Sequence, residues 1–272
     1  MRSLLVFLLI NGLGIAAPAL ANPCQSVSSY DVDRLRTAAI ETDLDKFDTA
    51  LGPFTVRDLR IVRQDVFPQE HQWLARQTNR FHLLTREWVL EAALPFKVGE
   101  VVSEPILAEA ERVLRDKPYL YDARVFVRRI CDGQADVDVV VRDVWTLSPT
   151  LDFNRMGGDN DFGLGVGDVN ILGLGKSVDI GYQDKDGRKG MNLYLNDPNI
   201  RGSRWTARVV LAYNDDGHLY GVNVSLPYHA MDSRFATGFQ ASDFVREEGL
   251  YLINDKIWEI DARTETMQMF VG

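Results

Sequence analysis

The segment DVNILGLG at Asp168–Gly175 decides the predicted fold, because a near copy, DPNIRGSR, follows at Asp197–Arg204. Both share the pattern Asp-x-Asn-Ile-x-Gly, and they begin 29 residues apart. Asparagine, aspartate and glycine favour tight turns. After each segment apolar residues alternate with other residues, as at Val178, Ile180 and Tyr182. A turn repeated at this spacing predicts a unit of two long β-strands joined by hairpins.

The polar residues of the two turns have two interpretations. Aspartates in an Asp-x-Asn pattern can bind calcium. More often such side chains hydrogen-bond the backbone of their own turn, and we favour that role. The turn residues singled out are Asp168, Asn170, Gly173, Asp197, Asn199 and Gly202.

Composition indicates a folded protein that does not bind nucleic acid. The 272 residues allow one large domain or two medium ones, and 46% of them are hydrophobic. The formal net charge is −9, and no block of basic residues interrupts this acidic chain. An acidic chain of this kind argues against a nucleic-acid partner.

The first residues have the features of a secretory signal peptide. Arg2 precedes the apolar run Leu4–Ile10, and Ala19–Ala21 is a small-x-small cleavage site. We expect a signal peptide at 1–21 and a polar lead-in segment at 22–52. In an oxidising compartment Cys24 and Cys131 could form a disulfide, and a spare thiol is an equally good interpretation.

Residues 53–145 predict an α+β domain with the order β-α-α-β-β. Thr85 and Ser103 are placed to cap two helices, and Pro105 suits a first helical turn. The stretch 64–84 has no regular pattern, and we expect it to be irregular. The expected strands are 54–62, 121–130 and 136–145, and the expected helices begin after Thr85 and Ser103 and end before Pro95 and Pro118.

After Trp145 the pattern is that of strands alone, with two kinds of connection. The repeated turns form one kind, and polar connections such as 245–263 form the other. Turns at one rim and loops at the other suit a β-barrel. The expected strands are 145–154, 162–169, 176–183, 191–196, 203–214, 218–226, 234–244 and 264–271.

Five of these strands, 145–154, 176–183, 191–196, 203–214 and 218–226, have one apolar face and one polar, glycine-rich face. Alternation of this kind fits a membrane barrel with a wet lumen, and it also fits a soluble sandwich. The signal peptide and the repeated turns favour the barrel. The series Gly163-x-Gly165-x-Gly167 is not a phosphate-binding loop, because no helix follows it. With scattered histidines and no nucleophile motif, we expect no metal, no cofactor and no enzymatic activity.

The residues resemble a known superfamily. The segment 53–145 resembles a polypeptide-transport-associated (POTRA) domain, and the segment from Trp145 resembles the start of the surface-antigen barrel of outer-membrane protein insertases. The stretches that carry the resemblance are Arg142–Pro149, Gly163–Gly175 and Asp197–Arg204. Barrels of this superfamily have about sixteen strands, whereas eight are expected here. The superfamily's Arg-Gly-aromatic motif is also absent from the sequence.

The resemblance implies an α+β POTRA domain in the periplasm, followed at 146–272 by an antiparallel outer-membrane β-barrel of about eight strands. Three interpretations remain for the strand count: part of a larger barrel, a small closed barrel, or pairing with another chain. The implied function is assembly, insertion or translocation of unfolded outer-membrane or secreted client proteins. The implied surroundings are the lipid bilayer and accessory periplasmic proteins.

Two strand edges are candidates for client binding. An exposed edge of the small domain could accept an extended client segment, or it could simply be solvated and protected by its arginines. The edge residues are Ala123, Arg124, Val125, Phe126, Val127 and Arg128. By resemblance alone, the first barrel strand forms a seam with the residues Thr146, Leu147, Ser148, Leu151 and Phe153.

Two other functions are weighed against assembly. The first is a passive outer-membrane pore or structural barrel, which deletion of the small domain would leave unaffected. The second is a soluble secreted binding module, which a carbonate or urea wash would release from membranes.

Overall fold

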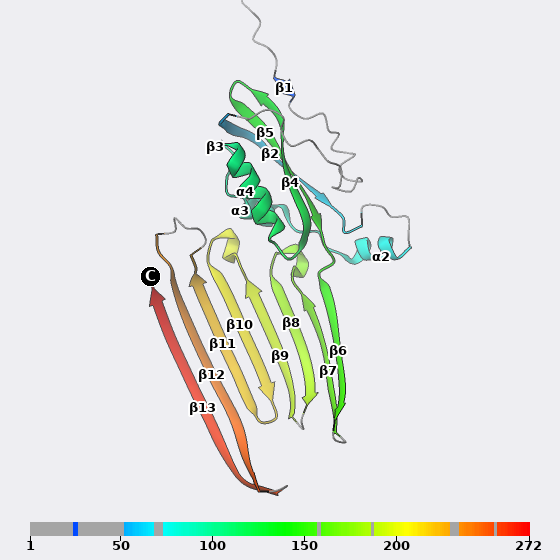
Figure 1. Ribbon diagram of the computed structural model, residues 1–272, viewed down its shortest axis with the longest axis vertical. Helices are drawn as coiled ribbons and strands as arrows, with labels where there is room; N and C mark the ends of the chain where they lie inside the picture. Colours follow the sequence, from blue (N-terminus) through cyan, green and yellow to red (C-terminus); the bar gives the residue numbers. More distant parts are fainter. Residues whose placement is uncertain are drawn as a thin grey trace, which may run out of the picture.

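The protein is described by a computed structural model that covers residues 24–26, 52–67, 73–156, 159–185, 188–228, 234–252 and 255–272. An α+β unit (residues 24–26 and 52–143, here the N-terminal unit) stands at one end of a large antiparallel sheet (here the C-terminal sheet; Figure 1). The expected signal peptide and most of the lead-in segment lie outside the described residues.

The N-terminal unit has a five-stranded sheet in the order β1-β4-β5-β2-β3. Strands β2 and β5 are parallel and the other pairs are antiparallel. Along the chain, β2, α3, α4, β4 and β5 follow the predicted β-α-α-β-β succession. The elements of this unit are β1 (Gln25–Ser26), β2 (Phe54–Gln64), α2 (Trp73–Phe81), α3 (Glu87–Ala93), β3 (Val101–Val102), α4 (Glu104–Arg115), β4 (Leu120–Cys131) and β5 (Gln134–Asp143).

Helices α3 and α4 cover one face of this sheet. A stripe formed by Leu90 of α3 and by Leu107 and Leu114 of α4 is buried on this side. It packs against alternate residues of the central strands, among them Val125 and Val139. The other face of β5 carries polar residues, so the core lies between the helices and one side of the sheet.

Two predictions for the N-terminal unit are wrong. The stretch expected to be irregular contains the end of β2 and the helix α2. Thr85 does not cap α3, whose N-cap residue is Arg86. Ser103 is at the N-cap of α4 and a proline occupies the first turn, as predicted, although the Ser103 side chain makes no capping bond.

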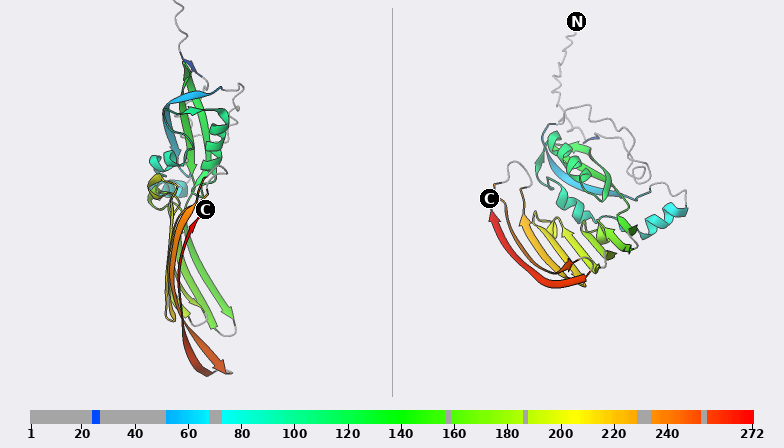
Figure 2. Two further views of the ribbon diagram at one scale, coloured as in Figure 1. Left: turned by 90° about the vertical axis from the view of Figure 1, so that its left-hand side faces the viewer. Right: turned by 60° about the horizontal axis from the view of Figure 1, so that its bottom comes forward.

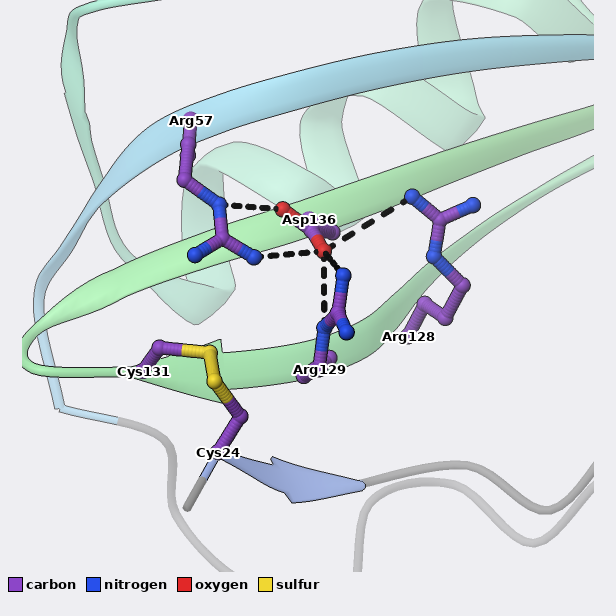
Figure 3. Close-up of a disulfide and its surroundings, with 6 residues drawn as sticks. All are labelled: Cys24, Arg57, Arg128, Arg129, Cys131 and Asp136. Carbon is purple, nitrogen blue, oxygen red and sulfur yellow. Dashed lines mark hydrogen bonds and ion pairs between the residues drawn. A yellow bond between two sulfur atoms is a disulfide. The ribbon is translucent and has the colours of Figure 1, made fainter.

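A disulfide joins Cys24 to Cys131, with 4.4 Å between their Cα atoms (Figure 3). It holds the two-residue strand β1 against the end of β4, where Gln25 pairs with Ile130 and Ser26 with Arg129. Of the two interpretations left open by the sequence, the structure therefore shows the disulfide.

The C-terminal sheet has eight antiparallel strands in sequence order, as predicted. It forms a single curved layer (Figure 2), and its repeated turns form the rim that faces the N-terminal unit (Figure 1). The elements are β6 (Leu147–Met156), β7 (Asp159–Asp168), η1 (Ile171–Gly173), β8 (Ser177–Lys185), β9 (Arg188–Asp197), η2 (Ile200–Gly202), β10 (Thr206–Asn214), β11 (Gly217–Leu226), β12 (Thr237–Leu252) and β13 (Asp255–Val271).

The register of the strands confirms the two predicted faces. One row of directly paired residues runs across six strands, from β6 to β11, and all its members are apolar or aromatic: Pro149, Val166, Ile180, Leu193, Leu211 and Tyr220. On the other face Gly165 pairs with Gly181, and a Cβ added at Gly181 would collide with the side chain of Asn192. The glycines therefore make room for polar side chains on a crowded face.

The prediction of a long polar connection at 245–263 is wrong. Strand β12 continues to Leu252 and β13 begins at Asp255, so the two strands form a hairpin that extends beyond β11. The charged residues Glu247 and Glu248 gave this part of β12 the pattern of a loop. The hairpin extends past β11 here, and without that neighbouring strand an apolar face is not required. Among the described residues, no helix is both long and apolar enough to cross a bilayer.

Candidate functional site

The first aspartate of each repeated turn hydrogen-bonds the backbone of its own turn. Asp168 Oδ1 accepts from the N–H of Asn170 at 2.8 Å, and Asp197 Oδ1 accepts from the N–H of Asn199 at 3.1 Å. These are the hydrogen bonds that the favoured capping role predicts.

Each turn then continues as one turn of 3-10 helix with the same unusual backbone. The φ angle is 55° at Leu172 and 70° at Gly173, and it is 51° at Arg201 and 75° at Gly202. Residues other than glycine rarely adopt positive φ, so its recurrence at the same position is specific. The repeat in sequence therefore encodes a repeat in backbone geometry.

The first turn is docked on the N-terminal unit by three hydrogen bonds. Asn170, which is 2% exposed, donates from Nδ2 to Oγ1 of Thr85 at 2.7 Å. Arg86 donates its backbone N–H to the Gly173 carbonyl at 2.9 Å and its Nε to the Leu172 carbonyl at 3.3 Å. We call this contact the junction.

A buried aspartate anchors the N-terminal side of the junction. Asp143 Oδ2 accepts from the Thr85 N–H at 2.7 Å and from Thr85 Oγ1 at 2.9 Å, and it lies 3.1 Å from Nε2 of His82. Thr85 thus donates to Asp143 while it accepts from Asn170. Burial, together with the negative charge of Asp143, raises the pKa of neighbouring Tyr119 to about 12. Thr85, Asp143 and Asn170 are all buried, and the Asn170 amide is satisfied there by Thr85 Oγ1 and by the Gly175 N–H.

The second turn lies near α3 but is less enclosed. A Cβ added at Gly202 would lie 3.1 Å from the Cβ of Ala92. Asn199 donates from Nδ2 to the carbonyl of Ser203, within its own turn. Lys176 ties the two turns together through an ion pair of 2.8 Å with Asp197. Among the described residues, the first turn and not the second therefore shares a buried polar group with the N-terminal unit.

The predicted seam residues lie on β6 or just before it. In the described sheet, β6 is an edge strand that pairs only with β7. Thr146 precedes the strand and is 6% exposed, whereas Leu151 and Phe153 are 79% and 74% exposed. Leu147 and Ser148 are also exposed, so the strand presents a free edge and open side chains.

The predicted client-binding edge, 123–128, lies on β4. In the described residues, β1 covers only the far end of its outer side. Two side chains of α4 bond to the backbone of this side: Glu111 Oε1 accepts from the Val125 N–H at 2.9 Å, and Arg115 Nε donates to the Ala123 carbonyl at 3.0 Å. Arg124 pairs with Asp122 of the same strand, and Arg128 pairs with Asp58 and Asp138. The edge is thus partly occupied by the protein's own helix.

The apolar face of the C-terminal sheet is interrupted at its last strands. Asp243 and Glu265 extend the apolar row described above. Arg263 contacts both carboxylates, at 3.3 Å and 2.6 Å, and His218 Nε2 lies 3.3 Å from Asp243. Asp243 belongs to β12, and Arg263 and Glu265 belong to β13. No apolar or polar face was predicted for these two strands.

The junction residues Thr85, Asp143 and Arg86 were not predicted as site residues. Their partners are 58 to 86 residues away in the chain, so no local pattern connects them. The only signal in the sequence was the difference between the two turns. The first turn continues with a second glycine, Gly175, where a Cβ would meet Val89 and the hydroxyl of Tyr119.

Comparison with known proteins gives structural matches only. No protein-family model matches the sequence, and no curated protein does. Among solved structures, BamA from Haemophilus ducreyi lacking POTRA domains 1–3 matches 80% of this chain at 13% identity, with a TM-score of 0.49. CdiB from Acinetobacter baumannii matches 80% at 11% identity with a TM-score of 0.32, and CdiB from Escherichia coli matches 88% at 12% identity with a TM-score of 0.23. The chain covers 43%, 53% and 60% of these three chains, respectively.

Proposed function

We propose that this protein assembles, inserts or translocates client proteins at the bacterial outer membrane. In this proposal the C-terminal sheet is part of an outer-membrane β-barrel, and the N-terminal unit is a POTRA domain in the periplasm. The clients are unfolded outer-membrane or secreted proteins, and accessory periplasmic proteins are further partners.

The observation that carries the proposal is the position of β6. It is an edge strand, and three residues, 144–146, connect it to β5 of the N-terminal unit. The junction holds that unit against the neighbouring turn of the same sheet. A client segment bound by the N-terminal unit would therefore be delivered beside a strand with unpaired backbone groups.

Strand addition supplies the free energy that such a function needs. Unpaired N–H and C=O groups at a sheet edge pair readily with another extended chain, and they are costly to leave unpaired in lipid. Burial of the client's own apolar face in the bilayer adds to this gain. We propose that the protein acts without a cofactor and without covalent chemistry.

A passive barrel or pore is the second candidate. It is favoured by one observation, the occupation of the β4 edge by Glu111 and Arg115, because a client would have to displace these side chains. In that case the N-terminal unit would have a structural role only.

Photo-crosslinking at the seam tests the proposal. A photoreactive residue at Ser148 on β6 should capture client segments during their assembly. The matched control is Ser177 on β8, a strand that is paired on both sides. Equal capture at both positions, or no capture at either, would contradict client handling. If deletion of residues 53–143 also left client assembly unchanged, the passive barrel would be favoured.

A further inference from the structure

Four arginines gather on the face of the N-terminal sheet that α3 and α4 leave open. Figure 3 shows three of them, Arg57, Arg128 and Arg129, around Asp136. We call this surface the arginine face. It consists of two arginines from β2 and two from β4: Arg57, Arg60, Arg128 and Arg129.

Two fully buried aspartates of β5 organise the arginine face. Asp136, whose side chain is 2% exposed, accepts from Nε and Nη2 of Arg57 at 2.8 and 2.7 Å. It also accepts from Nε and Nη2 of Arg129 at 3.0 and 2.8 Å. Asp138 contacts Arg60 at 2.6 Å and Arg128 at 3.1 Å. Asp136 also lies 3.8 Å from Arg128, so each carboxylate fixes at least two guanidinium groups in place.

Two of the four arginines, Arg57 and Arg129, keep binding capacity after these bonds. The side chains of all four remain 27–49% exposed, and Arg129 is the most open. Within the described residues, Arg57 and Arg129 bond to Asp136 through Nε and Nη2, which leaves Nη1 of each for another acceptor. Arg57 and Arg129 are therefore two fixed guanidinium groups, each with an open Nη1, on a chain of net charge −9.

Stability alone does not explain this arrangement. A buried ion pair is often no better for stability than apolar residues of the same volume, because both charges must be desolvated. A planar guanidinium held in position is, however, well suited to recognise carboxylates or phosphates with paired hydrogen bonds.

We propose that the arginine face is a docking surface for an acidic polypeptide segment of a partner protein. Its position selects a carboxylate-bearing polypeptide over a lipid phosphate. Asp136 lies seven residues before the junction residue Asp143 on β5, which is about 23 Å along the strand. Lipid headgroups at the rim of the C-terminal sheet would be farther away than the screening length of about 10 Å. This choice between partners rests on the proposed membrane location, whereas the anion-binding surface itself does not.

The test is a binding titration with the full-length chain in detergent micelles. The probe is a fluorescein-labelled peptide of fifteen glutamates, followed by fluorescence anisotropy. We expect Arg129→Gln to weaken binding about five-fold or more, and Asp58→Asn to strengthen it about two-fold, because one removes a positive charge and the other a negative charge. Arg112→Gln is the matched control, since Arg112 is an exposed arginine of α4 that pairs only within its own helix end.

Several results would overturn the proposal. The first is equal binding by R129Q, D58N, R112Q and the wild-type protein. The second is binding of dihexanoylphosphatidylglycerol to the wild-type protein when the peptide itself does not bind. That result would assign the face to lipid. The third is peptide binding that occurs only after deletion of residues 27–51, a segment with six acidic and three basic residues. That result would assign the face to the protein's own chain.

D58N keeps the test informative if R129Q folds poorly. Asp58 is 58% exposed, and its loss leaves no buried group without a hydrogen-bond partner. Peptide binding is also independent of client assembly. Failure of the docking proposal and failure of the assembly proposal can therefore be told apart.

Discussion

Asn170 and Thr85 share a hydrogen bond of 2.7 Å across the boundary between the C-terminal sheet and the N-terminal unit. Asn199 occupies the same position in the second turn, and its side chain bonds only within that turn. Two residues equivalent in sequence therefore have different surroundings, and each serves as the control for the other.

We expect Asn170→Ala to loosen the junction far more than Asn199→Ala. The first change removes a partner from buried Thr85 and from the Gly175 N–H, at a cost of about 1–3 kcal/mol. The second removes an exposed bond worth at most about 1 kcal/mol. Hydrogen exchange of residues 83–90 measures the effect. Faster exchange to the same extent in both variants would contradict docking through the first turn alone.

The equivalent glycines give a second paired comparison. Gly173 and Gly202 both have positive φ, so alanine strains the backbone at each by about 1 kcal/mol. At Gly173 the added Cβ would also collide with the Leu84 carbonyl oxygen, whereas at Gly202 it meets only the Cβ of Ala92. We expect Gly173→Ala to lower the midpoint of thermal unfolding clearly more than Gly202→Ala. Equal losses would show that backbone strain alone decides both.

The stability of the N-terminal unit should fall in acid through Asp136. Hydrogen bonding from Arg57, with Arg129, lowers its pKa from 3.8 to about 2 despite the opposing effect of burial. The folded state thus favours the ionised form, and this contribution is complete above pH 3.8 and is lost as the pH falls toward 2. We expect Asp136→Asn to cost about 1–2 kcal/mol in urea unfolding at pH 6 and progressively less between pH 4 and 2. A cost independent of pH would contradict the ion pairs.

The sequence predicts the C-terminal sheet well where two constraints act together. Turn residues fix the ends of β8 and β10, and face alternation fixes the strands between them, so expected and observed bounds there differ by a few residues. In the extended part of the hairpin of β12 and β13 the alternation of apolar and polar faces is lost, so that constraint does not act there. The consecutive charged residues Arg246, Glu247 and Glu248 place charge on both faces of the strand, and this pattern resembles that of a loop.

The N-terminal unit shows a different limit of sequence analysis. Asp136 and Asp138 alternate with valines, as solvent-facing residues of a half-buried strand do, yet both are buried. Their burial depends on arginines from the neighbouring strands β2 and β4, which no pattern within β5 can reveal. The helices α3 and α4 could be predicted because their signals are local, whereas the junction and the arginine face depend on distant residues and could not.

Opening the outer edge of β4 tests whether clients use it. In Glu111→Ala the Val125 N–H loses its acceptor, at a cost of about 1–3 kcal/mol that a client carbonyl could recover. We expect this variant to increase capture of clients by a photoreactive residue at Tyr121, which is 60% exposed on β4. Glu109→Ala is the control, because Glu109 is an exposed residue of α4 that pairs with Arg112. Unchanged capture in a folded E111A protein would indicate that clients bind elsewhere.

Adjacent residues of β6 test the membrane assignment, because they lie on opposite faces of the sheet. Leu151 belongs to the apolar face and is 79% exposed, whereas Thr150 lies on the glycine-rich face opposite Gly165. An arginine on a lipid-facing side of a barrel costs about 2–4 kcal/mol near the bilayer centre, and an arginine facing a wet interior costs little. We therefore expect Leu151→Arg to reduce the fraction of protein that resists urea extraction from membranes, and Thr150→Arg to leave it near the wild-type level. If both variants resisted extraction equally, the apolar face would not contact lipid, and the outer-membrane location would have to be abandoned.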